Sequence, residues 1–432
     1  MTKPRLAIVS TYDAHCGIAG YTRALVKQIE DDFDIEIFDL NQLFMRATNP
    51  GLSAAADAMV KEFCARAATF DCVNIQFEFG TFGSRPQDIL RRFRWIVDAA
   101  PALSVTFHTV LQRAPFRHED FFNHLKRFWV GDAWKVLTDY RADSRLFDGV
   151  HRSLRAASRK KTVNVIAHTQ RDAQILRHGQ RLPNVYDHPL VFLKPAEAAQ
   201  LRSRSSRADF PLMEGLPSDA KIIGTFGFLS KYKGFETTVR TLRFLPEDYH
   251  LVIFGSVHPN DIRKYQEINP YIRQLLDIAD VDSSIADVVR GNLHVNITLP
   301  EDKQREAIVN PNSLAGRIHF LGAQTDEDFA RAMCLCDAVV MPYLEVGQSA
   351  SGAISIALDV GARIIAAHNA AFLQFARYFP NSIEMFDIGN HIELAERLQA
   401  RPAFPPQTRS RAYDTETNRA MYREANTARG RG

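Results

Sequence analysis

The fold is decided by one stretch of the sequence, which reads Asp337-Ala-Val-Val-Met-Pro-Tyr-Leu-Glu-Val-Gly-Gln-Ser-Ala-Ser-Gly-Ala-Ile-Ser-Ile-Ala-Leu-Asp-Val-Gly-Ala-Arg-Ile-Ile-Ala-Ala367. Its apolar run 339–341 is short and stops at Pro342, which fits the end of a buried strand better than a helix. From about Gly352 the apolar positions take up a helical spacing, which Gly361 ends before a second apolar run. The stretch therefore predicts a strand, a loop of small residues, a helix and another strand.

The loop in this stretch is suited to binding an anion. Backbone N–H groups at a helix start lack partners within the helix, and the helix dipole there favours a negative charge such as a phosphate. We expect Ser349, Ser351 and Gly352 to form part of a ligand site. The alternative is that these residues serve only as turn and N-cap residues. Glu345 in the same loop either binds sugar hydroxyls or solvates the loop.

The composition is that of a globular protein, with 46% hydrophobic and 24% charged residues in 432. This length exceeds the usual size of one core, so we expect two domains. No run of about 18 apolar residues is present, and the N-terminal segment leads into a strand-like run without signal-peptide features, so we expect a cytoplasmic protein. Five cysteines without zinc-type spacing fit a reducing compartment. The formal charge of +3 is too small to argue for nucleic acid.

Strand-like apolar runs alternate with amphipathic helical segments along the chain, which is the order that parallel sheets with crossover helices need. We expect an α/β fold of two Rossmann-like domains facing each other across a cleft. In the first half the strand-like runs are 6–10, 35–38, 73–76, 105–108, 136–137 and 163–167. In the second half they are 222–226, 251–254, 318–321, 338–341, 364–366 and 384–386.

The alternation lapses once, in a polar, Ser/Arg-rich and Pro-punctuated segment that reads as a linker. The predicted domains are thus an N-terminal domain 1–193, a linker 194–220, a C-terminal domain 221–400 and a tail 401–432. The tail contains a predicted helix at 411–425. The long segment 259–311 is expected to be a partly helical insertion.

In open parallel sheets, ligands bind outside the carboxyl ends of the strands, and several candidates lie at such ends. Gly17 follows the first strand in a glycine loop that lacks the GxGxxG spacing, so a nicotinamide or flavin is not expected; a tight turn is the alternative. His108 ends the fourth strand and either faces the ligand or is a satisfied core histidine. Gln76 and Glu78 close the third strand and either face a ligand or form its wetter side.

Lys233 follows the first strand of the second domain, in the sequence Ser230-Lys-Tyr-Lys-Gly234. A lysine beside a small-residue turn is a mobile point charge with three donors, which suits a phosphate. The alternative is a solvated surface lysine.

Five stretches taken together resemble the GT-B retaining glycosyltransferases of family 4, and the likeness covers nearly the whole chain. They are Cys16-Gly-Ile-Ala-Gly-Tyr-Thr-Arg23, Ile75-Gln-Phe-Glu-Phe-Gly80, Thr106-Phe-His-Thr109, Gly224-Thr-Phe-Gly-Phe-Leu-Ser-Lys-Tyr-Lys-Gly234, and 320–322 with 337–342.

The resemblance implies a nucleoside diphosphate-sugar donor held mainly by the C-terminal domain, and a glycan acceptor held mainly by the N-terminal domain. It implies transfer with retention of anomeric configuration, with no bound metal and no cofactor. Gly17, Lys233, Ser351 and Gly352 would contact the donor diphosphate, with Glu345, Gln348 and Ser349 beside them. His108 would lie near the reacting sugar. Gln76 and Glu78 would lie on the acceptor side, and helix 411–425 would cross back onto the N-terminal domain.

Two departures from the family pattern bear on activity. Phe228 stands where the family often has Arg, and Gln348 and Ile356 stand where a pair of glutamates is expected. Some relatives resemble this chain in having Ser-Gly-Ala in that loop. The resemblance implies a hexosyltransferase-type enzyme of surface or exopolysaccharide biosynthesis. A catalytically inactive homologue that serves as a scaffold or subunit in a glycan-assembly complex is the alternative.

Basic stretches with aromatic neighbours complicate the choice of partners. They lie at 91–95, 152–161 and 409–431, and either rest on anionic lipid, where a lipid-linked acceptor would be, or are solvated faces. Peripheral contact with the inner face of the membrane is thus one expectation. No stacking motif or known binding module supports nucleic acid as a partner.

Overall fold

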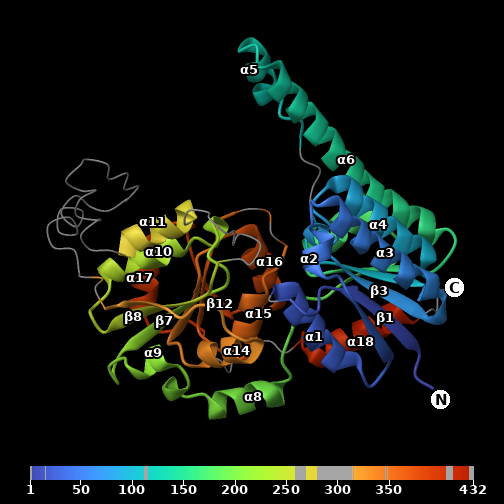
Figure 1. Cartoon of the computed structure of the whole chain (residues 1–432). Coiled ribbons are helices and arrows are strands. Elements are labelled where there is room, and N and C mark those ends of the chain that lie inside the picture. Colours follow the sequence, from blue (N-terminus) through green and yellow to red (C-terminus); the bar gives the residue numbers. More distant parts are fainter. Residues whose placement is uncertain are drawn as a thin grey trace. The chain divides into compact units, whose positions relative to one another are not determined.

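A computed structural model describes residues 2–14, 16–110, 115–257, 269–279, 314, 316–345, 347, 349–404 and 412–427. The chain divides into two compact units (Figure 1). Unit 1 comprises Met1–Leu190 and Thr415–Gly432, and unit 2 comprises Val191–Asp414. Each is built on its own six-stranded sheet. The prediction of two Rossmann-like α/β domains is therefore confirmed.

The sheet of unit 1 is parallel throughout and has the order β2-β1-β3-β4-β5-β6. β3, β4 and β5 are buried along their whole length, as expected for strands covered on both faces. The strands are β1 (Arg5–Ser10), β2 (Asp34–Asp39), β3 (Cys72–Phe77), β4 (Leu103–Phe107), β5 (Val163–Ala167) and β6 (Val185–Asp187).

Helices α3, α4 and α6 cover one face of this sheet, and α1 and α18 lie on the other (Figure 1). α4 and α6 approach closely at Gly149, where an added Cβ would lie 2.6 Å from the Leu90 side chain. The helices of unit 1 are α1 (Gly17–Ile29), α2 (Gln42–Met45), α3 (Pro50–Arg66), α4 (Pro86–Ala99), α5 (His118–Lys126), α6 (Val130–Ser158), α7 (Gln170–Gln174) and α18 (Thr415–Asn426).

One predicted strand of unit 1 is wrong. Val136 and Leu137 lie within the 29-residue helix α6, because two apolar residues in a long run without proline follow the helical period. The sixth strand is instead β6, a three-residue edge strand too short to show alternation.

α18 is part of unit 1 although it ends the chain. It contacts α1, β3, β4 and β5. Asn418 hydrogen-bonds to Gln28 at 2.7 Å, and Arg419 pairs with Asp32 at 2.6 Å. The helix therefore completes the polar face of the unit 1 sheet.

The sheet of unit 2 is also parallel, in the order β12-β11-β10-β7-β8-β9. All the strands predicted for the second half are present. They are β7 (Lys221–Phe226), β8 (Tyr249–Phe254), β9 (Ile318–Phe320), β10 (Ala338–Met341), β11 (Ile364–Ala367) and β12 (Ile383–Phe386).

The helices of unit 2 pack on both faces of its sheet around two apolar clusters. They are α8 (Pro195–Arg204), α9 (Pro211–Glu214), α10 (Phe235–Thr241), α11 (Pro270–Ala279), α14 (Asp326–Cys334), α15 (Gly352–Asp359), α16 (Ala370–Tyr378) and α17 (His391–Gln399). Apart from α11, nearly all of the expected insertion 259–311 lies outside the described residues. Among the described residues, no helix combines the length and apolar character that crossing a bilayer requires.

The segment 194–220 is not the linker that its composition predicts. It forms α8 and α9 and belongs to unit 2. Phe210 and Met213 are buried in the unit 2 core, and Arg202 donates hydrogen bonds to the Val360 carbonyl. The segment is therefore held on unit 2 by these two apolar side chains and by the hydrogen bonds of Arg202 to the backbone.

Candidate functional site

The topology of unit 2 brings two loops together. β7 and β10 are neighbours in the sheet, and the strand order runs outward in opposite directions on either side of them. Such a reversal is a topological switch point, where ligands bind in α/β sheets. The loop after β7 carries Lys233, and the loop after β10 leads to Ser351 and Gly352.

Gly234 fixes how these loops meet. Its φ is +64°, a left-handed conformation, and an added Cβ would lie 2.1 Å from the Pro342 carbonyl oxygen. The Leu344 amide donates to the Tyr232 carbonyl at 2.8 Å. A side chain at position 234 would push the loops apart, so the glycine places Lys233 against the residue after Pro342, which is Tyr343.

Lys233 is a buried cation held by tyrosines. Its residue is only 7% exposed, and its Nζ donates to Tyr343 Oη and lies 3.8 Å from the centroid of that ring. Tyr343 Oη in turn lies 3.3 Å from Ser351 Oγ. No carboxylate among the described residues pairs with Lys233, and burial lowers its pKa from the ordinary value. Within the part of the chain that the structure describes, the positive charge is therefore not neutralised.

The start of α15 lies beside this lysine. Ser351 is its N-cap residue and is 5% exposed, yet its side chain does not cap the helix. The backbone N–H groups of the first turn have no intrahelical acceptors. At Gly352 an added Cβ would lie 3.1 Å from the Phe192 ring, so a larger residue there would require that ring to shift. A cation and a helix start thus converge at the switch point, which is suited to a phosphate.

The remaining predicted residues of this loop have different surroundings. Both carboxylate oxygens of Glu345 accept backbone N–H groups, from Gly347 at 3.2 Å and from Ala370 at 2.7 Å. Glu345 therefore ties the loop to the start of α16. Ser349 is buried, and Gln348 lies outside the described residues.

In unit 1 the switch point lies between β1 and β3. Gly17 opens α1 after β1; an added Cβ there would meet nothing within 4 Å, so packing does not require the glycine. Glu78 follows β3, and its carboxylate accepts a hydrogen bond from the backbone N–H of the next residue, Phe79, at 3.2 Å. Burial raises the pKa of Glu78, while the hydrogen bond with Thr109 opposes that rise.

His108 and Gln76 are brought together at the ends of β4 and β3. His108 Nε2 lies 2.9 Å from Gln76 Oε1. Gln76 is fully buried and does not face solvent, so its role toward His108 is to orient the ring through this hydrogen bond. The rings of Tyr21 and His168 pack against His108 at centroid distances of 5.6 and 5.1 Å. Burial and the neighbouring His168 hold the pKa of His108 well below its ordinary value.

A chain of hydrogen bonds from α18 fixes the direction of these contacts. It begins at the backbone carbonyl of Tyr422, which only accepts, so the amide group 2.8 Å away must be Asn426 Nδ2. Asn426 Oδ1 then accepts from the hydroxyl of Ser104. Because the Ser104 hydroxyl donates its only proton to Asn426, it can only accept in its contact with Asn74. The donor is Asn74 Nδ2, at 2.6 Å.

The same logic continues to the histidine. Asn74 Oδ1 accepts from Gln76 Nε2 at 2.6 Å, which leaves Gln76 Oε1 as an acceptor facing His108. His108 Nε2 must therefore carry the proton. Since the low pKa keeps the ring neutral, Nδ1 carries the lone pair.

Several residues of these two sites are not identifiable from sequence patterns. Tyr343 follows the proline after β10, which is the one local signal available for it. Asn426 and Ser104 are 322 residues apart in the chain, and His168 follows β5 without a distinctive motif. Only the tertiary fold brings these groups to their sites.

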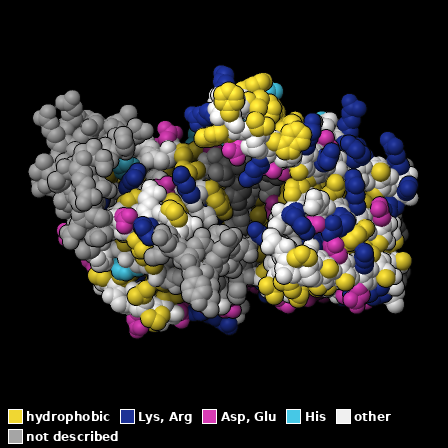
Figure 2. Space-filling model, turned by 45° about the horizontal axis from the view of Figure 1, so that its top comes forward, with side chains coloured by type: hydrophobic (Ala, Val, Ile, Leu, Met, Phe, Trp, Pro, Cys, Tyr) yellow, Lys and Arg dark blue, Asp and Glu magenta, His cyan; other side chains and the backbone are white. Residues whose placement is uncertain are grey.

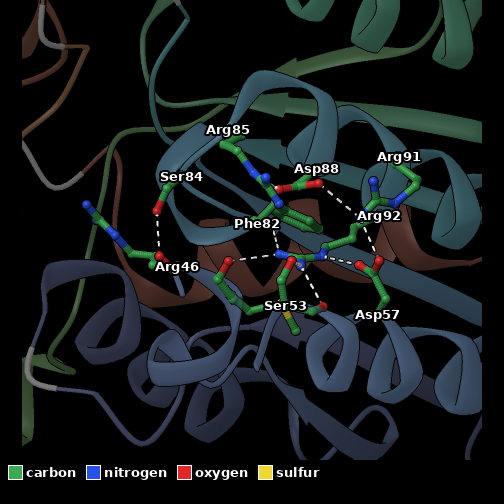
Figure 3. Close-up of polar contacts among 10 residues, drawn as sticks. Arg46, Ser53, Asp57, Phe82, Ser84, Arg85, Asp88, Arg91 and Arg92 are labelled. Carbon is green, nitrogen blue, oxygen red and sulfur yellow. Dashed lines mark hydrogen bonds and ion pairs between the residues drawn. The ribbon is translucent and has the colours of Figure 1, made fainter. Parts of the chain in front are cut away.

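Two of the three arginines in the basic stretch 91–95 form ion pairs within unit 1. Arg92 is fully buried and donates to Asp57 and to the carbonyls of Met45 and Phe82 at 2.7 to 2.9 Å (Figure 3). Arg91 pairs with Asp57 at 2.6 Å. Elsewhere, Lys161 donates to backbone carbonyls of α4 and its C-terminal end, and Arg409 and Arg431 lie outside the described residues.

Comparison with known proteins identifies the fold. No protein-family model and no curated protein sequence matches the chain. Among solved structures, HepE of Anabaena in complex with UDP and glucose matches with a TM-score of 0.57 at 14% identity over 98% of both chains. Sucrose-phosphate synthase of Thermosynechococcus elongatus matches with a TM-score of 0.55 at 15% identity, over 98% of this chain and 95% of that one.

A third similar structure is the α,α-trehalose 6-phosphate synthase of Burkholderia multivorans. Its TM-score is 0.57 at 12% identity, over 98% of this chain and 95% of that one. Likeness at such low identity concerns the fold. The protein has the GT-B fold, as the sequence resemblance implies.

Proposed function

We propose that the protein is a retaining glycosyltransferase that transfers a sugar from a nucleoside diphosphate-sugar to a hydroxyl group of a glycan acceptor. The observation that carries the proposal is the buried ammonium of Lys233, which no carboxylate of the described residues neutralises. It lies beside the start of α15, at the switch point of a GT-B domain. A buried charge without a counter-ion is unfavourable, and a diphosphate would supply the missing negative charge.

The proposed chemistry requires mainly stabilisation of the departing diphosphate. Lys233 and the N–H groups of the first turn of α15 would hold that developing charge, as preorganised donors do in other transfer enzymes. No metal or cofactor is part of this proposal. Tyr343 would keep the ammonium in place when the site is empty.

His108 would act in unit 1 as a neutral hydrogen-bond acceptor. Its Nδ1 lone pair is suited to receiving a hydrogen bond from a sugar hydroxyl, and its Nε2 proton is already donated to Gln76. Glu78 and Gly17 stay predictions for the acceptor and donor contacts of this unit, whereas the buried Gln76 would act only through His108.

The test is an assay of the purified full chain for donor turnover. HepE has been crystallised with UDP and with UDP-glucose, so UDP-sugars are the first donors to try. We expect one nucleoside diphosphate-sugar to be consumed with release of nucleoside diphosphate when an extract of glycans or lipid-linked glycans is added. Absence of turnover with every nucleotide-sugar and acceptor tested contradicts the proposal.

A non-catalytic scaffold is the second candidate. It is favoured by Glu345, whose two oxygens are occupied by backbone N–H groups, and by the Gln348 and Ile356 departures. Complementation of a deletion strain separates the two: a scaffold keeps its cellular role in the Lys233→Met variant, whereas an enzyme loses it.

A further inference from the structure

Most of the large exposed hydrophobic side chains of unit 1 lie at one place, the tip of the helical hairpin formed by α5 and the start of α6. Figure 1 shows these helices projecting from the rest of the unit. The exposed fractions are 54% for Phe122, 90% for Phe128, 51% for Trp129, 63% for Val130 and 62% for Trp134. Contiguous exposed apolar surface of this kind marks an interaction site. We call residues 122–135 the hairpin tip.

The exposure is not a failure of the hairpin to pack. Phe116 contacts Phe121 and Tyr140 at centroid distances of 5.5 and 5.1 Å, and Ala133 is 1% exposed. These inner residues hold α5 against α6. The aromatic side chains of the tip are thus additional to the contacts that the hairpin itself needs.

Basic residues accompany the aromatic ones. Lys126, Arg127 and Lys135 are exposed, and the Arg127 guanidinium lies 5.4 Å from the centroid of the Trp129 ring. Between Phe122 and Gly131 the sequence has no acidic residue, and Asp132 is the single one in the tip. Figure 2, with the top of the molecule turned forward, shows basic and hydrophobic side chains next to each other on this part of the surface.

The acidic residues of α5 lie at its other end, away from the tip. Glu119 and Asp120 occupy its first turn, and Asp120 pairs with Arg117. Since a helix rises about 1.5 Å per residue, these carboxylates are separated from the α5–α6 turn by roughly 10 Å. Positive charge therefore predominates where the aromatic side chains are.

We propose that the hairpin tip binds the interfacial layer of a membrane that contains anionic lipid. Tryptophan has an apolar ring and a polar N–H, which suits the boundary between headgroups and acyl chains. Lysine and arginine can lay their stems along apolar surface while their charges contact lipid phosphate. The membrane contact that the basic stretches predicted is thereby assigned to a different segment.

Charge favours a lipid surface over a protein partner. Lysine is depleted in the cores of protein interfaces, yet Lys126 and Lys135 lie among the aromatic side chains. A two-fold contact between copies of the chain would set like charges of Lys126 and Arg127 against each other. The proposal does not depend on the transferase activity, because lipid binding is measured without substrate.

The test uses the Trp95→Phe variant of the full chain. The chain has three tryptophans, so Trp129 and Trp134 are then the only indoles. We expect their fluorescence to shift to the blue, and the protein to co-sediment, with vesicles of equal parts phosphatidylcholine and phosphatidylglycerol. Replacing Phe128 and Val130 by Ser should weaken partitioning by roughly 100-fold. Lys126→Gln with Arg127→Gln should weaken it roughly 30-fold, at about a fivefold loss per basic residue.

Leu43→Ser is the matched control, because Leu43 is 70% exposed but lies on α2, outside the hairpin. It should leave partitioning and the thermal unfolding midpoint unchanged. Absence of binding to anionic vesicles overturns the proposal, as does equal binding of the tip variants. If the tip variants instead change the sedimentation coefficient of the protein alone, the tip is a contact between copies and the proposal is wrong.

Discussion

Arg92 in unit 1 and Lys233 in unit 2 are both buried cations, but their surroundings differ. Arg92 donates to Asp57, to the carbonyls of Met45, Phe82 and Ser53, and to the Ser53 hydroxyl, at 2.7 to 3.2 Å. Lys233 has the hydroxyl and ring of Tyr343 and the ring of Tyr232.

The comparison separates a structural charge from one that is ready for a ligand. The charge of Arg92 is neutralised and its donors are matched, so it holds α2, α3 and α4 together. The charge of Lys233 is desolvated and has no carboxylate partner among the described residues. A buried cation is therefore informative about function only when its counter-charge is missing.

The largest expected effect is on stability, and it should be much larger at Arg92 than at Lys233. Arg92→Met leaves the buried acceptors around it unpaired and should lower the free energy of unfolding by about 3–5 kcal/mol. Lys233→Met removes a desolvated charge and should lower it by less than about 1 kcal/mol. Chemical denaturation measures both, with Arg94→Met, at an exposed position on the same helix as Arg92, as the control. Equal losses at the two sites contradict the comparison.

The second effect is on activity. Lys233→Met should lower kcat/KM for the nucleotide-sugar by roughly 100- to 1000-fold, the loss typical of one preorganised donor at a developing negative charge. Lys221→Met is the matched control, because Lys221 is paired with Asp248 at 2.9 Å and lies at the opposite end of β7. Steady-state kinetics on the folded variants decides the matter; a loss of the same size in both would assign the effect to general charge.

The pH profile should divide between the two units. Burial lowers the pKa of Lys233 from 10.5, so nucleotide affinity is present below the lowered pKa and declines as the pH rises through it. The pKa of His108 is lowered from 6.5, so the ring is still neutral at pH 6.5 and its Nδ1 lone pair is available there. Turnover should decline only when the pH falls further, through the lowered pKa. The alkaline decline should disappear in Lys233→Met. An alkaline decline that survives this substitution belongs to another group.

The smallest effect concerns the hydrogen-bond chain from α18 to His108. Asn426→Ala removes its anchor, so the His108 tautomer should become mixed and kcat should fall about fivefold, the value of one neutral hydrogen bond. Asn418→Ala loosens α18 without touching that chain and should leave the tautomer unchanged. Long-range proton–nitrogen NMR reports the tautomer. A wild-type His108 protonated at Nδ1 would contradict the assignment directly.

The sequence predicts most of the fold because its signals are local. Strands such as β7 and β10 are short apolar runs bounded by polar residues or proline, and the glycine after Lys233 marks a turn. The misinterpreted run at Val136 is apolar over two residues, which is too short to distinguish a strand from one turn of a helix. The segment 194–220 looks like a linker because its docking depends on tertiary contacts of Phe210 and Met213.

The site is predictable only in part for a similar reason. Lys233, Ser351 and Gly352 follow strands and are recognisable by position. What distinguishes Lys233 from a surface lysine is its burial against Tyr343, 110 residues away in the chain. The orientation of His108 depends on Asn426 and Ser104. No local sequence pattern predicts that these two residues are in contact.

The central claim is that Lys233 is a buried cation whose missing counter-ion is a nucleoside diphosphate. Titration calorimetry with UDP, GDP, ADP and CDP tests it most directly, on the wild-type chain and on Lys233→Met. We expect at least one of these nucleotides to bind the wild type, and Lys233→Met to weaken that binding at least about tenfold, the effect of one charge-assisted hydrogen bond. Equal binding by the two proteins, or no binding by the wild type, would contradict the claim.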